Sequence, residues 1–252
     1  MRKARAYFER GGERFDQGDL EGAISDLSKA IAYNNPQHID SIRDRAYVTR
    51  GKAYELMGDV EKAFSHYNKI INSQGTVNAY AHFSAYAYRG TLNMRLGNYQ
   101  QALNDLNYVI KNTDIVRDAR RFDLFATYFN RALLNMVMND LPSAISDLDI
   151  SMKLNPNDID VYLTRAEAYF RLAQYEKAID DCRIAEKMDP LNAEIYFFKY
   201  RLNMRFGRLD DAITAGRRFL ELDRGSDYDI RNKVQQDLAN LLSQRGDLPD
   251  IF

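Results

Sequence analysis

Six basic side chains recur along the chain, and most have an acidic residue at one fixed distance. The basic residues are Arg10, Arg50, Arg89, Arg131, Arg165 and Lys199. The residues sixteen positions later are Asp26, His66, Asp105, Asp147, Asp181 and Ala215. Such pairs could form an anion-binding ladder, or they could brace two helices as ion pairs. We favour bracing as an ion pair between the two helices. Such a partly buried pair often adds little net stability but is costly to break singly.

The other groups that could do chemistry do not form a catalytic set. Cys182 is the single cysteine and has no base at a useful spacing, so we expect a small buried hydrophobic side chain and not a nucleophile. The histidines at 38, 66 and 82 form no His-x-x-x-His motif, and the sequence contains no Gly-rich phosphate loop and no Gly-x-Ser-x-Gly motif. We therefore expect no catalysis, no cofactor and no metal.

Composition and charge narrow the possible partners. The chain has 252 residues, with 35 Lys plus Arg against 36 Asp plus Glu. This balance argues against nucleic acid as a partner. No run of about 20 apolar residues is present to span a membrane. The first residues lack the apolar core of a signal peptide, so we expect a cytoplasmic protein; an exported protein whose signal has been removed is the alternative.

A six-residue phrase recurs along the chain and always ends in alanine. It reads Gly-Asp-Leu-Glu-Gly-Ala at 18–23 and Gly-Arg-Leu-Asp-Asp-Ala at 207–212. We call its last residue the anchor Ala; the six are Ala23, Ala63, Ala102, Ala144, Ala178 and Ala212. Their spacings are 40, 39, 42, 34 and 34 residues. A Tyr stands sixteen residues before each anchor, and a Gly or Ala stands twelve before in five cases, so the chain is an array of six repeats.

Each repeat has the pattern of two helices joined by a tight turn. Apolar residues follow the anchor at helical spacing, as Leu27 and Ile31 follow Ala23. Asp19 can cap the second helix after Gly18 ends the first. Asn-Pro or Asp-Pro at 35–36, 155–156 and 189–190 closes the second helix, since Pro cannot continue it. We expect the small residue of the first helix to face the anchor Ala and to let the helices approach closely.

These elements together resemble the tetratricopeptide repeat family. The likeness rests on the Tyr column, the small column, the Gly-x-Tyr/Leu-x-x-Ala phrase and the Asn/Asp-Pro pairs, over about residues 4–224. It implies an all-α, right-handed superhelical solenoid of about six helix-turn-helix repeats plus a C-terminal capping helix, as a single domain over 1–252. We place the repeats at about 4–37, 44–77, 83–116, 125–158, 159–192 and 193–226, the capping helix at 229–244 and a tail at 247–252.

The chain departs from the family pattern in two respects. The first three spacings exceed the family's 34 residues, so extra residues should lie around 35–43, 73–81 and 112–122. The sixth repeat has Tyr200, Gly216 and Phe219 where other residue types are usual, so we expect its packing to differ.

A second apolar row, which we call the inner row, runs along the first helix of each repeat. It occupies the positions 15, 11 and 8 before the anchor Ala, which share one helix face. The resemblance implies that this face lines the concave surface. We take the Phe- and Met-rich part as the candidate partner-binding groove: Met94, Phe129, Leu133, Met136, Leu163, Phe170, Phe197, Arg201 and Met204. The alternative is that tighter curvature buries the row as core.

We therefore expect a non-catalytic scaffold that binds a partner peptide or helix in the concave groove, because Met and Phe suit adaptable recognition. Two alternatives remain open. The solenoid could self-associate through the groove or the tail at 247–252, or it could be an accessory subunit of an enzyme complex. Some family members clamp acidic C-terminal peptides with Lys and Asn, but Phe8 and Gly12 occupy the matching positions here.

Overall fold

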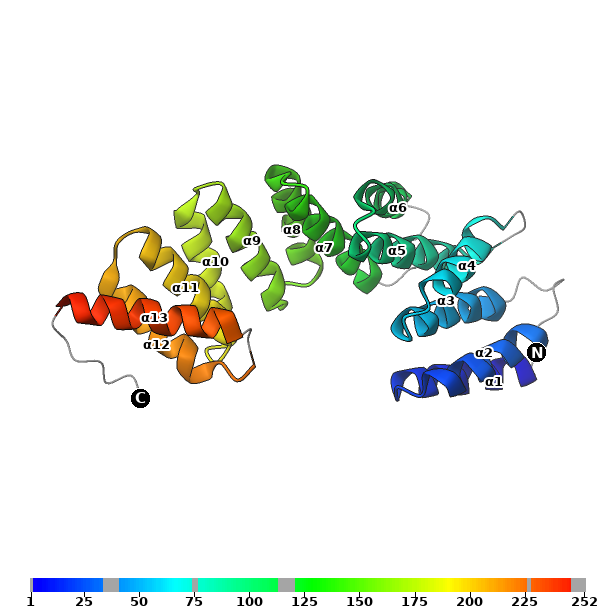
Figure 1. The fold of residues 1–252 in the computed structure, drawn as a ribbon. Coiled ribbons are helices and arrows are strands. Elements are labelled where there is room, and N and C mark those ends of the chain that lie inside the picture. Colours follow the sequence, from blue (N-terminus) through cyan, green and yellow to red (C-terminus); the bar gives the residue numbers. More distant parts are fainter. Residues whose placement is uncertain (1, 34–40, 74–76, 113–120, 226–227, 246–252) are drawn as a thin grey trace. The chain divides into compact units, whose positions relative to one another are not determined.

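The computed structural model describes residues 2–33, 41–73, 77–112, 121–225 and 228–245. These residues form thirteen α-helices and no strand (Figure 1). The helices are α1 (Arg2–Asp16), α2 (Leu20–Tyr33), α3 (Ser41–Leu56), α4 (Val60–Ile71), α5 (Ala79–Arg95), α6 (Tyr99–Lys111), α7 (Arg121–Val137), α8 (Leu141–Leu154), α9 (Ile159–Arg171), α10 (Tyr175–Met188), α11 (Ala193–Arg205), α12 (Leu209–Leu222) and α13 (Tyr228–Arg245). The prediction of an all-α helical repeat fold is confirmed.

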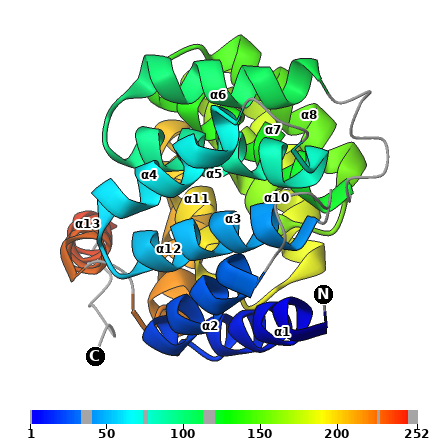
Figure 2. The same cartoon turned by 90° about the vertical axis from the view of Figure 1, so that its right-hand side faces the viewer.

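The residues group into two compact units, 1–134 and 135–252. In the first unit the hairpins are α1 with α2, α3 with α4, and α5 with α6. Figure 1 and Figure 2 both show α1 lying along α2. Each hairpin packs on the next, because α2 contacts α3 and α4 contacts α5.

The second unit repeats this arrangement. Its hairpins are α9 with α10 and α11 with α12, while α8 packs on α9 and α10 packs on α11. The last helix, α13, packs on α12 and is close to the predicted capping helix at 229–244. The single domain expected over 1–252 stays a prediction.

The turn inside each repeat requires one residue with positive φ. That residue stands five before the anchor Ala, and φ there is 82° at Gly18, 80° at Gly58, 78° at Gly97, 61° at Asn139, 58° at Ala173 and 65° at Gly207. Glycine adopts this conformation without a steric cost, which explains four of the six residue types. Where an Asp follows this residue, its side chain caps the next helix; Asp59, for example, accepts a hydrogen bond from the backbone N of Lys62 at 3.1 Å.

The anchor alanines are all fully buried. The small residue of the first helix meets a different partner from the one expected. A Cβ built at Gly51 would lie 2.6 Å from the Tyr67 ring, and one at Gly11 would lie 3.0 Å from Leu27. Both neighbours stand four residues after the anchor. The expectation that the anchor Ala is the nearest contact is therefore corrected: a small residue on one helix accommodates a large one on the other.

The sixth repeat reverses this small-to-large pairing, as its departure from the pattern predicted. Tyr200 takes the small position of the first helix, and Gly216 takes the large position of the second. A Cβ on Gly216 would lie 3.2 Å from Tyr200 and 3.1 Å from Leu238 of α13. The Tyr200 hydroxyl donates a hydrogen bond to Asp237 of α13 at 2.8 Å. The exchange therefore makes room for the capping helix and anchors it.

Several predicted features fall in ranges that the structure does not describe. Parts of the segments expected around 35–43, 73–81 and 112–122 lie outside the described residues, namely 35–40, 74–76 and 113–120. The same holds for the Asn-Pro pair at 35–36 and the tail at 247–252. The other two pairs are confirmed as helix ends: Asn155 follows the last residue of α8, and Asp189 follows that of α10.

Candidate functional site

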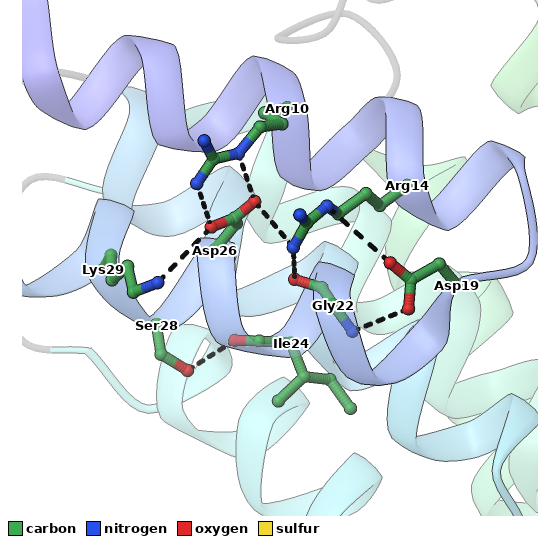
Figure 3. A network of polar contacts seen from close by, with 8 residues as sticks. All are labelled: Arg10, Arg14, Asp19, Gly22, Ile24, Asp26, Ser28 and Lys29. Atoms are coloured by element: carbon green, nitrogen blue, oxygen red, sulfur yellow. Dashed lines mark hydrogen bonds and ion pairs between the residues drawn. The ribbon is translucent and has the colours of Figure 1, made fainter.

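The Arg–Asp column forms a bidentate fork in the first repeat. Arg10 on α1 donates from Nε and Nη2 to the two carboxylate oxygens of Asp26 on α2, both at 2.6 Å (Figure 3). Asp26 is fully buried, and Arg14 at 3.2 Å and Lys29 at 3.7 Å add positive charge beside it. The hydrogen bond from Arg10 is the main cause that lowers the pKa of Asp26.

The same fork occurs in two further repeats. Arg89 reaches Asp105 at 2.8 and 2.6 Å, and Arg165 reaches Asp181 at 2.9 and 2.6 Å. In the second repeat Arg50 Nε donates to His66 Nε2 at 2.6 Å. These pairs confirm the bracing interpretation of the column, because each of these arginines already donates hydrogen bonds to a carboxylate or an imidazole of its own repeat.

The column arginines of the second to fifth repeats also contact the preceding repeat, a contact that the sequence did not predict. Arg50 Nη1 donates to Ser28 at 2.9 Å, and Arg131 Nη1 donates to Asn107 at 2.6 Å. The corresponding acceptors of Arg89 and Arg165 are Asn68 and Asp149. All four acceptors stand five residues after an anchor Ala. A polar residue at that spacing was the signal that could have revealed the contact.

The inner row of the second unit comes together around Arg201. Arg201 Nη1 on α11 donates to Glu167 on α9 at 2.9 Å. The guanidinium carbon lies 5.0 Å from the Phe170 ring centre, 5.9 Å from that of Phe197 and 5.6 Å from that of Phe198, within cation–π range. Glu167 also pairs with Arg171 at 2.9 Å. A charged pair therefore lies over aromatic side chains contributed by two consecutive repeats.

The predicted groove residues of this unit are half-buried, with one exception. Leu163, Phe170, Phe197, Arg201 and Met204 all retain some exposed surface. Each of the four apolar ones also packs against a buried cluster that includes residues of its own repeat and of the next helices. These side chains therefore pack partly against the core and remain partly exposed, where another molecule can contact them.

Met136 is the exception, and its placement corrects the predicted row. It is 7% exposed and packs with Leu141, Ala144 and Ala168. Its side chain packs against residues of α8 and α9, so it is not part of the exposed inner row.

In the first unit the row is more polar. Lys52 lies 5.5 Å from the Phe15 ring centre and 4.6 Å from that of Tyr88. Glu55 pairs with Arg95. These five residues belong to the first helices of the first three repeats, so charged contacts join successive repeats along the row.

The three groove candidates of the first unit are half-buried. Asn130 donates to Thr91 at 3.3 Å beside Phe129, which stacks on Phe125. Met94 packs against the buried cluster of Ala102, Leu106 and Leu134, and Leu133 is likewise half-buried.

Cys182 lies in the core, as the sequence predicted. It is 2% exposed, and burial raises the pKa of its thiol to about 12. A thiol with such a pKa holds almost no thiolate at neutral pH. Among the described residues, the His, Cys, Asp and Glu side chains form no group of three or more that could hold a metal ion. The described helices are all too short or too polar to cross a bilayer.

The stacked helical hairpins define the class of protein as an all-α repeat protein of the solenoid type. Two family models, both described as tetratricopeptide repeat, match residues 44–76 and 163–227. Human tetratricopeptide repeat protein 6 is 25% identical over 175 residues, which are 68% of this chain and 30% of that protein. This chain thus spans less than a third of that relative. These matches identify tetratricopeptide repeats at residues 44–76 and 163–227 of this chain.

Solved structures share the fold over nearly the whole chain. PilF from Pseudomonas aeruginosa matches with a TM-score of 0.73 and 20% identity, covering 94% of this chain and 98% of that one. PilW, described as a type IV pilus biogenesis factor, matches with a TM-score of 0.73 and 11% identity, covering 92% and 98%. The Cut9–Hcn1 structure of the APC/C matches with a TM-score of 0.69 and 16% identity, covering 95% and 43%. At these identities the likeness shows the fold alone.

Tetratricopeptide repeat proteins mediate protein–protein interactions, and their repeats are typically non-catalytic scaffolds. The tetratricopeptide repeat matches and the solenoid fold support an interaction scaffold in general terms.

Proposed function

We propose that the second unit binds a polypeptide segment along the inner row of α9 and α11. The observation that carries the proposal is the meeting of Glu167, Phe170, Phe197 and Arg201 across two consecutive repeats. The Glu167–Arg201 pair fixes which positions of the two helices face each other. By the spacing of the row, Leu163 has the same repeat position as Phe197, and Phe170 has the same repeat position as Met204.

This arrangement favours a partner segment with apolar anchors. Half-buried Phe and Met side chains bury more apolar surface when another apolar side chain covers them, and each square ångström removed from water contributes roughly 25 cal/mol. Aromatic residues and Arg are also the types that dominate the energetics of protein interfaces. The charges of Arg201 and Glu167 are largely paired already, so they orient a segment more than they attract one.

A displayed peptide library selected against the full chain tests the proposal. Selected peptides are titrated by fluorescence anisotropy against the wild type and against Phe197→Asn and Arg201→Glu. Because central aromatic and Arg residues carry most of the binding energy, each variant should weaken binding at least tenfold. Tyr228→Asn and Lys187→Glu are matched controls, since Tyr228 is 75% exposed on α13 and Lys187 is exposed on α10. Both controls should bind as the wild type does.

Three results would contradict the proposal. The selection could yield no peptide with apolar anchors, the controls could lose binding as strongly as the row variants, or light scattering could show that the row is covered by a second copy of the chain. Thermal unfolding of each variant is measured alongside, because Phe197 packs against the buried cluster around Phe219. A variant that loses binding while its midpoint stays within a few degrees supports the surface role.

A further inference from the structure

The second unit contains a cavity on a different face from the inner row. It has a volume of about 700 Å³ and is lined by α10, α11 and α12. Lys199 and Ala215 line it, and these residues stand where other repeats carry the Arg and Asp of the bracing fork. The cavity therefore occurs in the repeat where both column residues have changed.

The change removes both acceptors that an arginine at position 199 would need. Ala215 replaces the Asp of its own second helix, and Arg183 takes the position five after the anchor, where preceding repeats offer Ser, Asn or Asp. Lys199 instead donates to the two oxygens of Glu186 at 2.9 and 3.0 Å. The space filled by a guanidinium–carboxylate pair elsewhere is left open here.

The walls of this space are cationic and its floor is apolar. Ile179, Cys182 and Leu202 supply apolar surface, and the last two are buried. Five basic and three acidic side chains surround them: Arg183, Lys199, Arg208, Arg217 and Arg218 against Glu186, Asp211 and Glu221. Glu186 pairs with Lys199, Glu221 pairs with Arg218, and Arg183 pairs at 3.0 Å with Asp180, which is outside the lining. The remaining lining charges are Arg208 and Arg217 against Asp211, so the excess charge is positive.

We propose that this cavity binds an acidic peptide segment of a partner protein, whose carboxylate occupies the place left by the missing Asp at position 215. The carboxylate accepts hydrogen bonds from the cations of α10 and α12. Among them is Arg183, which stands where preceding repeats carry an acceptor. A neighbouring apolar side chain of the peptide covers Leu202 and Ile179. A volume of about 700 Å³ accommodates such a group of side chains, and binding pockets commonly have this size.

The proposal is tested with an array of synthetic hexapeptides, each containing one or two Asp or Glu residues and one apolar residue. The full chain is titrated with the best binders by fluorescence anisotropy at several salt concentrations. Acidic peptides should bind at least tenfold more tightly than their Asn and Gln analogues, and the affinity should fall as salt rises because the contact is ionic. Equal affinity for acidic and amide peptides would overturn the proposal.

Two variants locate the site. Ala215→Asp supplies the missing carboxylate from the protein itself, and Arg183→Glu reverses the charge beside it; each should abolish binding. Lys187→Glu on the exposed face of α10 is the matched charge control and should leave binding unchanged. Arg201→Glu should also leave it unchanged, which separates this site from the inner row.

Two outcomes would assign the cavity differently. Acidic peptides that bind Ala215→Asp as tightly as the wild type do not use this cavity. Free glutarate that binds as tightly as the best peptide would make the cavity a site for small carboxylates, and the peptide assignment would be wrong.

Discussion

Replacing Arg89 with methionine tests how much the bracing fork contributes to the stability of the first unit. Asp105 is 4% exposed and takes two hydrogen bonds from Arg89, at 2.8 and 2.6 Å. Arg89→Met leaves this carboxylate buried without its counter-charge. Breaking a buried pair in this way costs about 3–5 kcal/mol. We expect the lower end of that range, because the Arg89 side chain is 21% exposed and part of the pair is screened by solvent.

The reverse variant should be milder. Asp105→Leu leaves a guanidinium that retains access to water and to Asn68, its acceptor on the preceding repeat. The double variant Arg89→Met with Asp105→Leu removes both charges, and such a replacement is often neutral or stabilising. The destabilisations of the two single variants should therefore not add.

Urea unfolding followed by circular dichroism measures these differences. For a unit of this size, with a urea dependence of about 1.5–2.5 kcal/mol per M, a loss of about 3 kcal/mol lowers the midpoint by roughly 1–2 M. The double variant should recover most of this shift. A cost of less than about 1 kcal/mol for Arg89→Met would refute the reasoning, because the fork would then behave as a solvent-exposed ion pair.

Three further predictions concern single side chains. Burial and the neighbouring guanidinium lower the pKa of His66 below its usual 6.5, so the unfolded chain binds the proton more readily than the folded chain. The folded state should therefore lose stability as the pH falls through 6.5. Calorimetry between pH 7.5 and 5 should show this loss, and His66→Asp should remove it. Since burial raises the pKa of Cys182 to about 12, Ellman's reagent should react with it only as urea unfolds the second unit, and rapid labelling of the folded chain would contradict its core position. Gly51→Ala should lower the free energy of unfolding by about 1–3 kcal/mol, because its Cβ would lie 2.6 Å from the Tyr67 ring. Gly12→Ala is the control: a Cβ there would have nothing within 4 Å, so urea unfolding should show no destabilisation.

Contacts within one repeat could be predicted from the sequence, because they depend on spacing along a single hairpin. The interval of sixteen residues placed Arg10 beside Asp26 and Arg165 beside Asp181. The Gly or Asn before each capping Asp predicted a turn, and the structure shows the left-handed backbone conformation at these positions. These relations hold whatever the neighbouring repeats do.

Contacts between repeats could not be predicted as well, because they depend on how one hairpin packs on the next. The second acceptor of Arg50, Ser28, lies on a different repeat, and its role becomes visible once α2 and α3 are in contact. Burial of Met136 has the same cause, since its neighbours include Ala168 of the following repeat. The cavity beside Lys199 depends on three residues of two repeats and on their shared space.

Site-specific photocrosslinking tests the central claim most directly. A photoreactive phenylalanine analogue is placed at position 197 in the inner row, and in separate proteins at the exposed positions 187 and 228, and each protein is mixed with peptides selected on the wild type. The claim predicts that crosslinked peptide forms chiefly through position 197 and is competed by unlabelled peptide. Equal crosslinking at all three positions, or crosslinking at 187 and 228 without 197, would contradict it.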